Sequence, residues 1–362
     1  MGFALNIPLN KVSFGQVSFG LLKEILNRSM EPSLSLLGGA LDLSSQSLIT
    51  PQLQERIQFL IRKYIREHSR DTPCIKLWHL NGSLESISEK QLLISFYELD
   101  SPTQAELNAA KNNKTYFTSQ YTVDEFQAAG VKTHYLPLFF DHLNFRKIDK
   151  DYFDDGRIVF NLCGKFERRK HHAKVLSAWA NKYGGDNRYV LQCALYNHFL
   201  SPEDNEKAFM MALGGKKYSN IHILSPMEKN AQYNDFLNSA DIILGMSGGE
   251  GWGLPEFHST ALGKHSVILN AHGYKGWADE FNSCLVEPSG KTECYDGTFF
   301  LKGAEFNQGS IYDWEEDAFI DACEKAIERR KAGKVNEHGL SLQQDFTVQK
   351  TVDTLLKGLE DM

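Results

Sequence analysis

Residues 248–268 read GGEGWGLPEFHSTALGKHSVI, and this stretch indicates the fold class of the whole chain. Glycines flank Glu250, directly after the apolar run at 242–244, and the chain turns at 253–255. A helix-like segment follows and leads into an apolar strand at 266–269. This order predicts a strand, a tight loop and a helix with free N–H groups at its start. Ligands of α/β folds bind at the carboxyl ends of strands, so the stretch is either the floor of a binding site or an ordinary joint.

Length and composition indicate a globular protein of two domains. The chain has 362 residues, of which 42% are hydrophobic and 23% charged, and domains commonly hold roughly 100 to 200 residues. The net charge of −7 disfavours a protein whose main task is to grip nucleic acid, because phosphate binding needs a basic face. A local basic patch remains compatible with this charge.

The cysteines and the N-terminus predict a cytoplasmic protein. The six cysteines include no C-x-x-C pair, so there is no zinc signature. Several lie in apolar runs, as small core residues do in a reducing compartment. The N-terminus lacks the pattern of a signal peptide, and no run approaches the roughly 18 apolar residues of a membrane span. We therefore expect no transmembrane segment.

Strands and helices alternate along the chain, which predicts α/β domains with doubly wound parallel sheets. Gly15 is a lone glycine in the first strand–loop–helix unit, so the G-x-G-x-x-G dinucleotide fingerprint is absent and hydride transfer is disfavoured. Thr122 is predicted to cap a helix at 123–129, with Glu125 at the capping-box position. Strands are expected at 3–7, 34–37, 74–80, 91–97, 115–118, 133–137, 157–162, 189–196, 222–224 and 241–246. Helices are expected at 17–26, 51–68, 103–110, 175–182, 233–240, 317–329 and 348–359.

A polar, acidic stretch at 141–156 reads as a linker between two such domains. We predict an N-terminal domain at 1–146, a C-terminal domain at 147–345 and a final helical segment at 346–362. Small-molecule sites prefer domain interfaces and the carboxyl ends of strands. The functional residues should therefore lie in loops from both halves, facing each other across a cleft.

Two loops of the second half are candidates for such a site. The first is the basic loop from Gly164 to Lys170, where Lys165 and Lys170 can neutralise a diphosphate at a helix start. The alternative is a solvated basic loop. The second is the turn with Glu250, which can accept hydrogen bonds from sugar hydroxyls, or can merely cap the next helix. Together these loops suit a ligand with an anionic end and a polyhydroxylated end, such as a nucleotide sugar.

Candidates in the first half are His79, Glu98 and Asp100, which follow two predicted strands. Each can reach a reacting hydroxyl, although a structural histidine and two helix-capping carboxylates would have the same spacing. Asp154 and Asp155 look like an acidic metal-binding pair, but they precede a strand and so lie at the wrong end of it. We expect no metal site.

Four segments together resemble the GT-B glycosyltransferases, and among them glycosyltransferase family 4. The stretch SGGEGWGLP at 247–255 looks like the family's S-x-x-E-G-F-G-L-P, and the loop at 164–170 looks like its G-R-x-x-x-x-K. YFTSQYTVDEF at 116–126 with YLPLFFDHLNF at 135–145 resembles the end of its acceptor domain, and residues 234–247 resemble the helix and strand before its acidic motif. The resemblance covers roughly residues 95–288.

The resemblance implies two Rossmann-like domains facing across a cleft, with the C-terminal helix crossing back to the N-terminal domain. It implies a retaining transferase that uses a nucleotide-diphosphate sugar and no metal or other cofactor. Lys165 and Lys170 would hold the diphosphate and Glu250 the donor sugar, with His79 and Glu98 as further catalytic candidates. The other implied donor contacts are Gly15, Gln16, Gly164, Ser225, Pro226, Met227, Gly249, Gly251, Trp252, Gly253, Leu254 and His258.

The chain departs from the family at two positions. The family motif is E-x7-E, and His258 stands where the second glutamate would contact the donor ribose. A neutral histidine cannot take both ribose hydroxyls as a carboxylate can, and Glu256 lies on another side of the helix. Lys165 replaces an arginine, which retains the charge and loses the guanidinium fork.

Two alternative functions remain beside a glycosyltransferase acting on a glycan, a lipid-linked or another hydroxyl acceptor. His258 favours a degenerate GT-B protein that binds a sugar or a partner without turnover. A transferase acting on DNA bases is disfavoured by the net charge. The loops that would choose the acceptor, including 11–16, 38–48 and 80–88, carry no pattern that identifies it.

Overall fold

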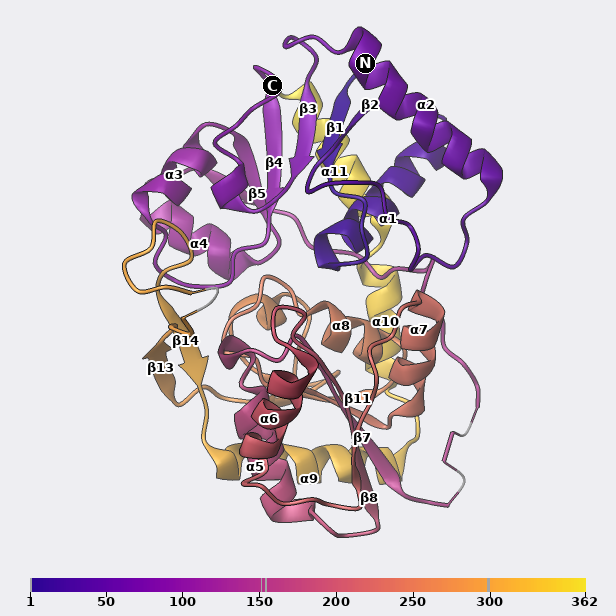
Figure 1. Cartoon of the computed structure of the whole chain (residues 1–362), viewed down its shortest axis with the longest axis vertical. Helices are drawn as coiled ribbons and strands as arrows, with labels where there is room; N and C mark the ends of the chain where they lie inside the picture. Colours follow the sequence, from indigo (N-terminus) through magenta and orange to yellow (C-terminus); the bar gives the residue numbers. More distant parts are fainter. Residues whose placement is uncertain (1, 151, 154, 298–299) are drawn as a thin grey trace.

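The N-terminal half forms a six-stranded parallel sheet in the order β2-β1-β3-β4-β5-β6 (Figure 1). The computed structural model describes residues 2–150, 152–153, 155–297 and 300–362. The strands are buried on both faces, as parallel strands between helices are. They are β1 (Ala4–Ile7), β2 (Ser33–Leu36), β3 (Cys74–Leu77), β4 (Gln91–Ser95), β5 (Lys114–Phe117) and β6 (Thr133–Tyr135).

The C-terminal half forms a second six-stranded parallel sheet, in the order β12-β11-β10-β7-β8-β9. Its strands are β7 (Ile158–Gly164), β8 (Tyr189–Leu195), β9 (Ile221–Ile223), β10 (Ile242–Gly245), β11 (His265–Leu269) and β12 (Cys284–Val286). In Figure 1 the two halves lie one above the other. The predicted α/β architecture is therefore confirmed, while the exact domain boundaries stay a prediction.

Helices connect the strands, and their starts follow simple rules. In α2 (Pro51–Glu67), Thr50 accepts a hydrogen bond from Leu53 N and Pro51 occupies the first turn, where no N–H is needed. The helix buries Leu53, Ile57 and Leu60 on one face. The others are α1 (Ser13–Asn27), α3 (Gln104–Lys111), α4 (Gln120–Ala128), α5 (His172–Tyr183), α6 (Pro202–Ala212), α7 (Asn230–Ser239), α8 (Leu254–Ala261), α9 (Glu316–Ala332) and α10 (Glu337–Asp345), with 3₁₀ turns η1 (Leu80–Gly82), η2 (Arg168–Lys170) and η3 (His272–Gly276).

The last helix, α11 (Val348–Glu360), returns to the N-terminal half, as predicted (Figure 1, yellow). It packs against α1, β3 and β4. Val352 and Leu355 are fully buried there, and Lys114 Nζ donates to the carbonyl oxygen of Gly358 at 2.9 Å. The chain thus crosses between the halves twice.

An antiparallel pair, β13 (Gly290–Glu293) and β14 (Ser310–Asp313), was not predicted. We call residues 290–297 and 300–313 the hairpin. It follows β12 in the sequence but binds the N-terminal half, where the segment joining its strands reaches the side of α3 and α4 (Figure 1, orange). Asp100 Oδ1 accepts from Ser310 N at 2.6 Å, and Asp100 Oδ2 accepts from Lys291 Nζ at 2.8 Å. The hairpin therefore bridges the two halves.

Several local predictions were wrong. Thr122 does not cap α4, because the helix begins at Gln120 and Ser119 Oγ accepts from Thr122 N at 3.2 Å. Ser119 and Thr122 are both good caps, and the earlier start buries Thr122, whose hydroxyl donates to Tyr97 O. The predicted strand at 74–80 ends at Leu77, because the chain there turns into η1. The short helices α6 and α10 were missed; α6 buries only Phe209, so its apolar periodicity is weak.

In the described part of the chain, no helix combines the length and hydrophobicity needed to cross a membrane. All six cysteines are buried and free.

Candidate functional site

The site lies where β7 and β10, neighbours in the second sheet, reach their carboxyl ends. The loop after β7 begins at Gly164, whose φ of 127° favours glycine. The loop after β10 carries Glu250 and ends at α8. Because parallel strands end at one edge of a sheet, the basic loop and the glutamate turn meet there. The sequence predicted this meeting.

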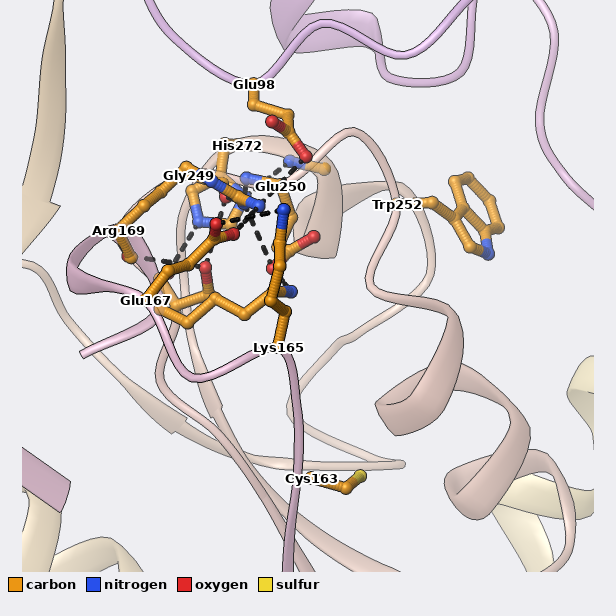
Figure 2. A network of polar contacts seen from close by, with 12 residues as sticks. Glu98, Cys163, Lys165, Glu167, Arg169, Gly249, Glu250, Trp252 and His272 are labelled. Atoms are coloured by element: carbon orange, nitrogen blue, oxygen red, sulfur yellow. Dashed lines mark hydrogen bonds and ion pairs between the residues drawn. The ribbon is translucent and has the colours of Figure 1, made fainter. Parts of the chain in front are cut away.

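Three carboxylates and three cations form ion pairs with one another at this edge of the sheet (Figure 2). We call these residues the ion-pair cluster: Glu98, Lys165, Glu167, Arg169, Lys170 and Glu250. Lys170 Nζ pairs with Glu250 Oε1. Arg169 Nη1 lies 3.3 Å from the same oxygen, so one carboxylate oxygen faces two cations. The side chains of Arg169, Lys170 and Glu250 are 4%, 13% and 9% exposed. The low exposure makes these charge-assisted contacts strong.

The cations keep Glu250 ionised. Burial by itself would raise the pKa of this carboxyl, but the charges of Lys170 and Arg169 outweigh burial and lower the pKa to about 2. The same contact with Glu250 raises the pKa of Lys170, against the effect of burial. Both groups are therefore charged throughout the physiological pH range.

His272 holds the backbone of Glu250, and the sequence analysis missed it. Its Nδ1 accepts from Glu250 N at 3.1 Å, and its Nε2 lies 2.7 Å from Ser247 O. A carbonyl oxygen only accepts, so the ring proton is assigned to Nε2. Burial lowers the pKa of His272 to about 4, so the ring is neutral at neutral pH. No sequence pattern pointed to His272, because it belongs to the next strand–loop unit.

Glu98 brings the N-terminal half into the cluster. Its Oε1 lies 3.1 Å from Arg169 Nη2, and its side chain is 30% exposed. The glycines of the turn allow this close approach, since a Cβ on Gly249 would lie 2.4 Å from Glu98 O. Thr118 Oγ1 also donates to Gly251 O at 2.8 Å. The two halves are thus in direct contact at the site.

Arg169 and Glu167 were not singled out from the sequence, although they stand in the basic loop. Arg169 Nη2 lies 2.6 Å from Glu167 Oε1, and Nη1 donates to Gly249 O. Lys165 lies 3.1 Å from Glu167 Oε2, and its Nζ stands 5.6 Å from the ring centre of Phe199. The guanidinium of the cluster therefore comes from position 169, although the resemblance directed attention to position 165.

His258 is not brought to the cluster. Its Nε2 accepts from the backbone N–H of Asp141 at 3.3 Å, and its ring packs 4.5 Å from the ring of Phe145. Burial lowers the pKa of His258 to about 3. The side chain faces the segment that connects the two halves. Trp252 also points away from the ion pairs in Figure 2, and it packs on Phe257 and Phe346.

Glu256, two residues earlier on α8, takes the other side and faces the cluster. The carboxyl is 4% exposed, and its Oε2 has no hydrogen-bond partner among the described residues. Burial raises the pKa of Glu256 to about 7, with Lys170 opposing and Glu250 adding to the shift. Around neutral pH this buried carboxyl is therefore partly protonated.

Other predicted residues make their contacts outside the cluster. Gln16 Oε1 accepts a hydrogen bond from Asn230 Nδ2 of the C-terminal half at 2.9 Å. Gly15, in the first turn of α1, lies against Asn10. The loop with Ser225, Pro226 and Met227 leads from β9 to α7, and its first two residues are exposed. His79 stacks on Phe14 at 4.3 Å and borders a hollow of about 10 Å³ near Phe96.

Among the described residues, no three His, Cys, Asp or Glu side chains lie together in a group that could hold a metal ion. Of the acidic pair considered from the sequence, Asp154 lies outside the described residues. Asp155 Oδ2 pairs with Arg157 Nη2 at 2.6 Å on the surface.

No protein-family model and no curated protein matches the chain. Solved structures match over its whole length. Sucrose-phosphate synthase from Thermosynechococcus elongatus gives a TM-score of 0.71 at 11% identity, covering 100% of this chain and 98% of the other. WaaG, a glycosyltransferase involved in lipopolysaccharide biosynthesis, gives 0.63 at 11% identity and 98% coverage of both chains. HepE from Anabaena, in complex with UDP-glucose, gives 0.65 at 13% identity and 100% coverage of both.

This chain has the GT-B fold. The fold predicted from the resemblance is therefore confirmed, including two parallel sheets and a C-terminal helix that crosses back. At these identities the likeness establishes the fold, and membership of glycosyltransferase family 4 stays a prediction. In the GT-B frame the ion-pair cluster lies between the two domains.

Proposed function

We propose that the protein is a glycosyltransferase that moves a sugar from a nucleotide-diphosphate sugar to a hydroxyl acceptor. The observation that carries the proposal is the pairing of Lys170 with Glu250 at adjoining strand ends of a GT-B fold. Cations there suit a diphosphate and a carboxylate suits sugar hydroxyls. HepE, which shares the fold, has been crystallised with UDP, with UDP and glucose, and with UDP-glucose, so uridine nucleotides are the first donors to test.

In this proposal the basic loop stabilises the charge that develops on the leaving diphosphate, which is the largest electrostatic demand of the reaction. Lys170 is held ready for this by Glu250, which in turn would orient the donor sugar. Retention of configuration, with no protein nucleophile and no metal, is part of the proposal. Independence of a metal is supported by the cations of the loop, which can take up charge that a metal neutralises in other transferases.

The acceptor would enter from the N-terminal domain. His79 and Glu98 follow the neighbouring strands β3 and β4 there, and Glu98 reaches the cluster directly. The exposed loop at 225–227 is proposed to meet the base of the donor. A cytoplasmic location belongs to the same proposal and is supported by the six free, buried thiols.

A second candidate is donor binding without turnover. It is favoured by His258, whose Nε2 is engaged by the Asp141 backbone and whose ring is enclosed by Phe140 and Phe145. Since position 258 then offers no carboxylate to the ribose, a bound nucleotide could be held less firmly than catalysis requires.

The test is a thermal-shift screen of UDP, GDP and ADP sugars, followed by measurement of donor hydrolysis and of transfer to mixed glycan acceptors. We expect one donor to raise Tm and to be hydrolysed, and we expect Lys170→Ala to remove at least about 90% of the hydrolysis, since one charge-assisted contact contributes about 1.5–3 kcal/mol. Lys182→Ala, an exposed lysine on α5, serves as the matched control.

The outcomes separate the two candidates. A donor that raises Tm without hydrolysis or transfer supports binding without turnover. If no donor raises Tm and Lys170→Ala behaves as the wild type does, both candidates fail.

A further inference from the structure

Arg169 is the most enclosed cation of the site. Its guanidinium contacts carboxylates from three separate segments: Glu167 on its own loop, Glu250 on the neighbouring turn and Glu98 on the facing domain. Its Nε is buried without a hydrogen-bond partner among the described residues. A guanidinium presents several donors in a fixed fork, which matches phosphate oxygens as well as carboxylates.

Arg169 and Lys170 converge on a single acceptor. Glu250 Oε1 pairs with Lys170 Nζ and lies 3.3 Å from Arg169 Nη1. An anionic oxygen shared by two adjacent cations is the arrangement that a phosphate oxygen also satisfies. Carboxylate oxygens therefore occupy positions that also suit the oxygens of an anionic ligand.

Lys165, Arg169 and Lys170 face the same number of carboxylates. A diphosphate that approaches Arg169 meets the carboxylates that already contact this guanidinium, and their repulsion at short range opposes its binding. The three carboxylates differ in how easily they can leave. Glu167 is 2% exposed and is shared by Lys165 and Arg169, and Glu250 is anchored through its backbone by His272.

Glu98 is the carboxylate that can leave. It belongs to the other domain, its side chain is 30% exposed, and its contact with the cluster is a single pair with Arg169 at 3.1 Å. Separation of the domains, or rotation of this side chain, frees one N–H of Arg169 Nη2, while the contact of Nη2 with Glu167 Oε1 stays in place. The pair is thus a contact across the cleft that a ligand anion can replace.

We propose that Arg169 binds the diphosphate of the donor, and that Glu98 occupies this guanidinium in the ligand-free protein and is exchanged for the diphosphate on binding. This inference rests on the function proposed above and extends it. Glu98 then acts as a competitor of the donor diphosphate, and Arg169 supplies the fork that Lys165 lacks.

The proposal predicts opposite effects for the two partners. Glu98→Gln removes the competing charge, so the protein should bind inorganic pyrophosphate and UDP at least about threefold more tightly, because a charged contact no longer has to be broken. Arg169→Lys keeps the charge and loses the fork, so both ligands should bind about tenfold or more weakly. Arg188→Lys is the matched control, because Arg188 is 77% exposed and pairs with Asp186 outside the basic loop.

Affinities are measured by titration calorimetry on the full-length protein, with Tm recorded for every variant. If Arg169 only holds the loop together, Arg169→Lys lowers Tm and Glu98→Gln does not tighten binding, and the proposal is overturned. Should Arg169→Lys fail to fold, the tightening in Glu98→Gln still decides the matter.

The two proposals fail in distinguishable ways. A wild-type protein that transfers sugar while both variants bind pyrophosphate and UDP unchanged refutes only the role of Arg169 and Glu98. A wild type that binds neither probe and no nucleotide sugar refutes both.

Discussion

The position of Glu256 on α8 buries its carboxyl and raises the pKa of this group well above the usual value. It shares the first turns of α8 with His258, yet the two side chains face opposite surroundings, the ion-pair cluster and the interdomain segment. The spacing of two residues on a helix requires this divergence. Which of the two faces the site follows from how α8 packs on its neighbours.

We expect Glu256→Gln to become increasingly more stable than the wild type as pH rises. The pKa of about 7 in the folded state lies above the ordinary value of 4.5 for this carboxyl, so the folded state binds the proton more tightly. The free energy of unfolding of the wild type therefore decreases as pH rises from about 4.5 through 7. The glutamine variant lacks this loss and should be more stable above pH 7 by about 3 kcal/mol at most, at 1.36 kcal/mol per pKa unit.

Urea unfolding between pH 5 and 8.5 measures this difference. The exposed Glu67→Gln should show no growing difference over the same range. A difference between Glu256→Gln and wild type that stays constant with pH would falsify this prediction.

At the scale of elements, the hairpin is held by a carboxylate that sequence analysis had offered as a helix cap. Asp100 binds Lys291 of β13 and Ser310 N of β14, while α3 is capped by Thr103 and Glu106. β14 also bonds the glutamate turn, since Tyr312 N donates to Gly248 O at 2.8 Å. One carboxylate therefore links the hairpin, the N-terminal domain and the edge of the site.

Asp100→Ala should loosen the hairpin without unfolding either sheet. Amide hydrogens at 290–293 and 310–313 should exchange about tenfold faster or more, because hydrogen bonds to a charged group contribute about 1.5–3 kcal/mol. Exchange in β7 and β8 should not change. Hydrogen exchange with mass spectrometry measures both regions, with exposed Asp124→Ala on α4 as the control. Equal exchange of the hairpin in wild type and Asp100→Ala would show that Asp100 does not hold it.

The strands also show which elements a local pattern of apolar residues can predict and which it cannot. The three-residue edge strand β12 was missed, whereas the other parallel strands were predicted, because their apolar residues lie between turn residues. The hairpin was not, because the strand Gly290–Glu293 is fully exposed and carries no apolar alternation. Its pairing is stabilised by contacts with residues distant in sequence, which no local window contains.

At the scale of the whole molecule, α11 ties the two ends of the chain together. It packs against α1, β3 and β4, and Arg28, directly after α1, donates to Gln349 O at 3.1 Å. The N-terminal domain is therefore complete only when the last residues of the chain have folded onto it.

Leu355→Ala should destabilise the N-terminal domain by about 2–4 kcal/mol, because it removes a fully buried side chain and leaves a cavity. Lys357→Ala, on the exposed face of the same helix, should change stability by less than about 0.5 kcal/mol. Chemical unfolding followed by tryptophan fluorescence measures both. Similar losses in the two variants would mean that α11 does not complete the domain.

The sequence by itself determined the α/β architecture and the meeting of the basic loop with the Glu250 turn, which follow from apolar runs and turn residues over short stretches of chain. The GT-B fold was implied by the resemblance of four segments to that family. Only the tertiary structure decided that Arg169 supplies the guanidinium, that His272 holds Glu250, that Glu98 crosses to the other domain and that His258 faces away. Each of those facts depends on packing between distant segments, where burial and neighbouring charge set the orientation and ionisation of a side chain.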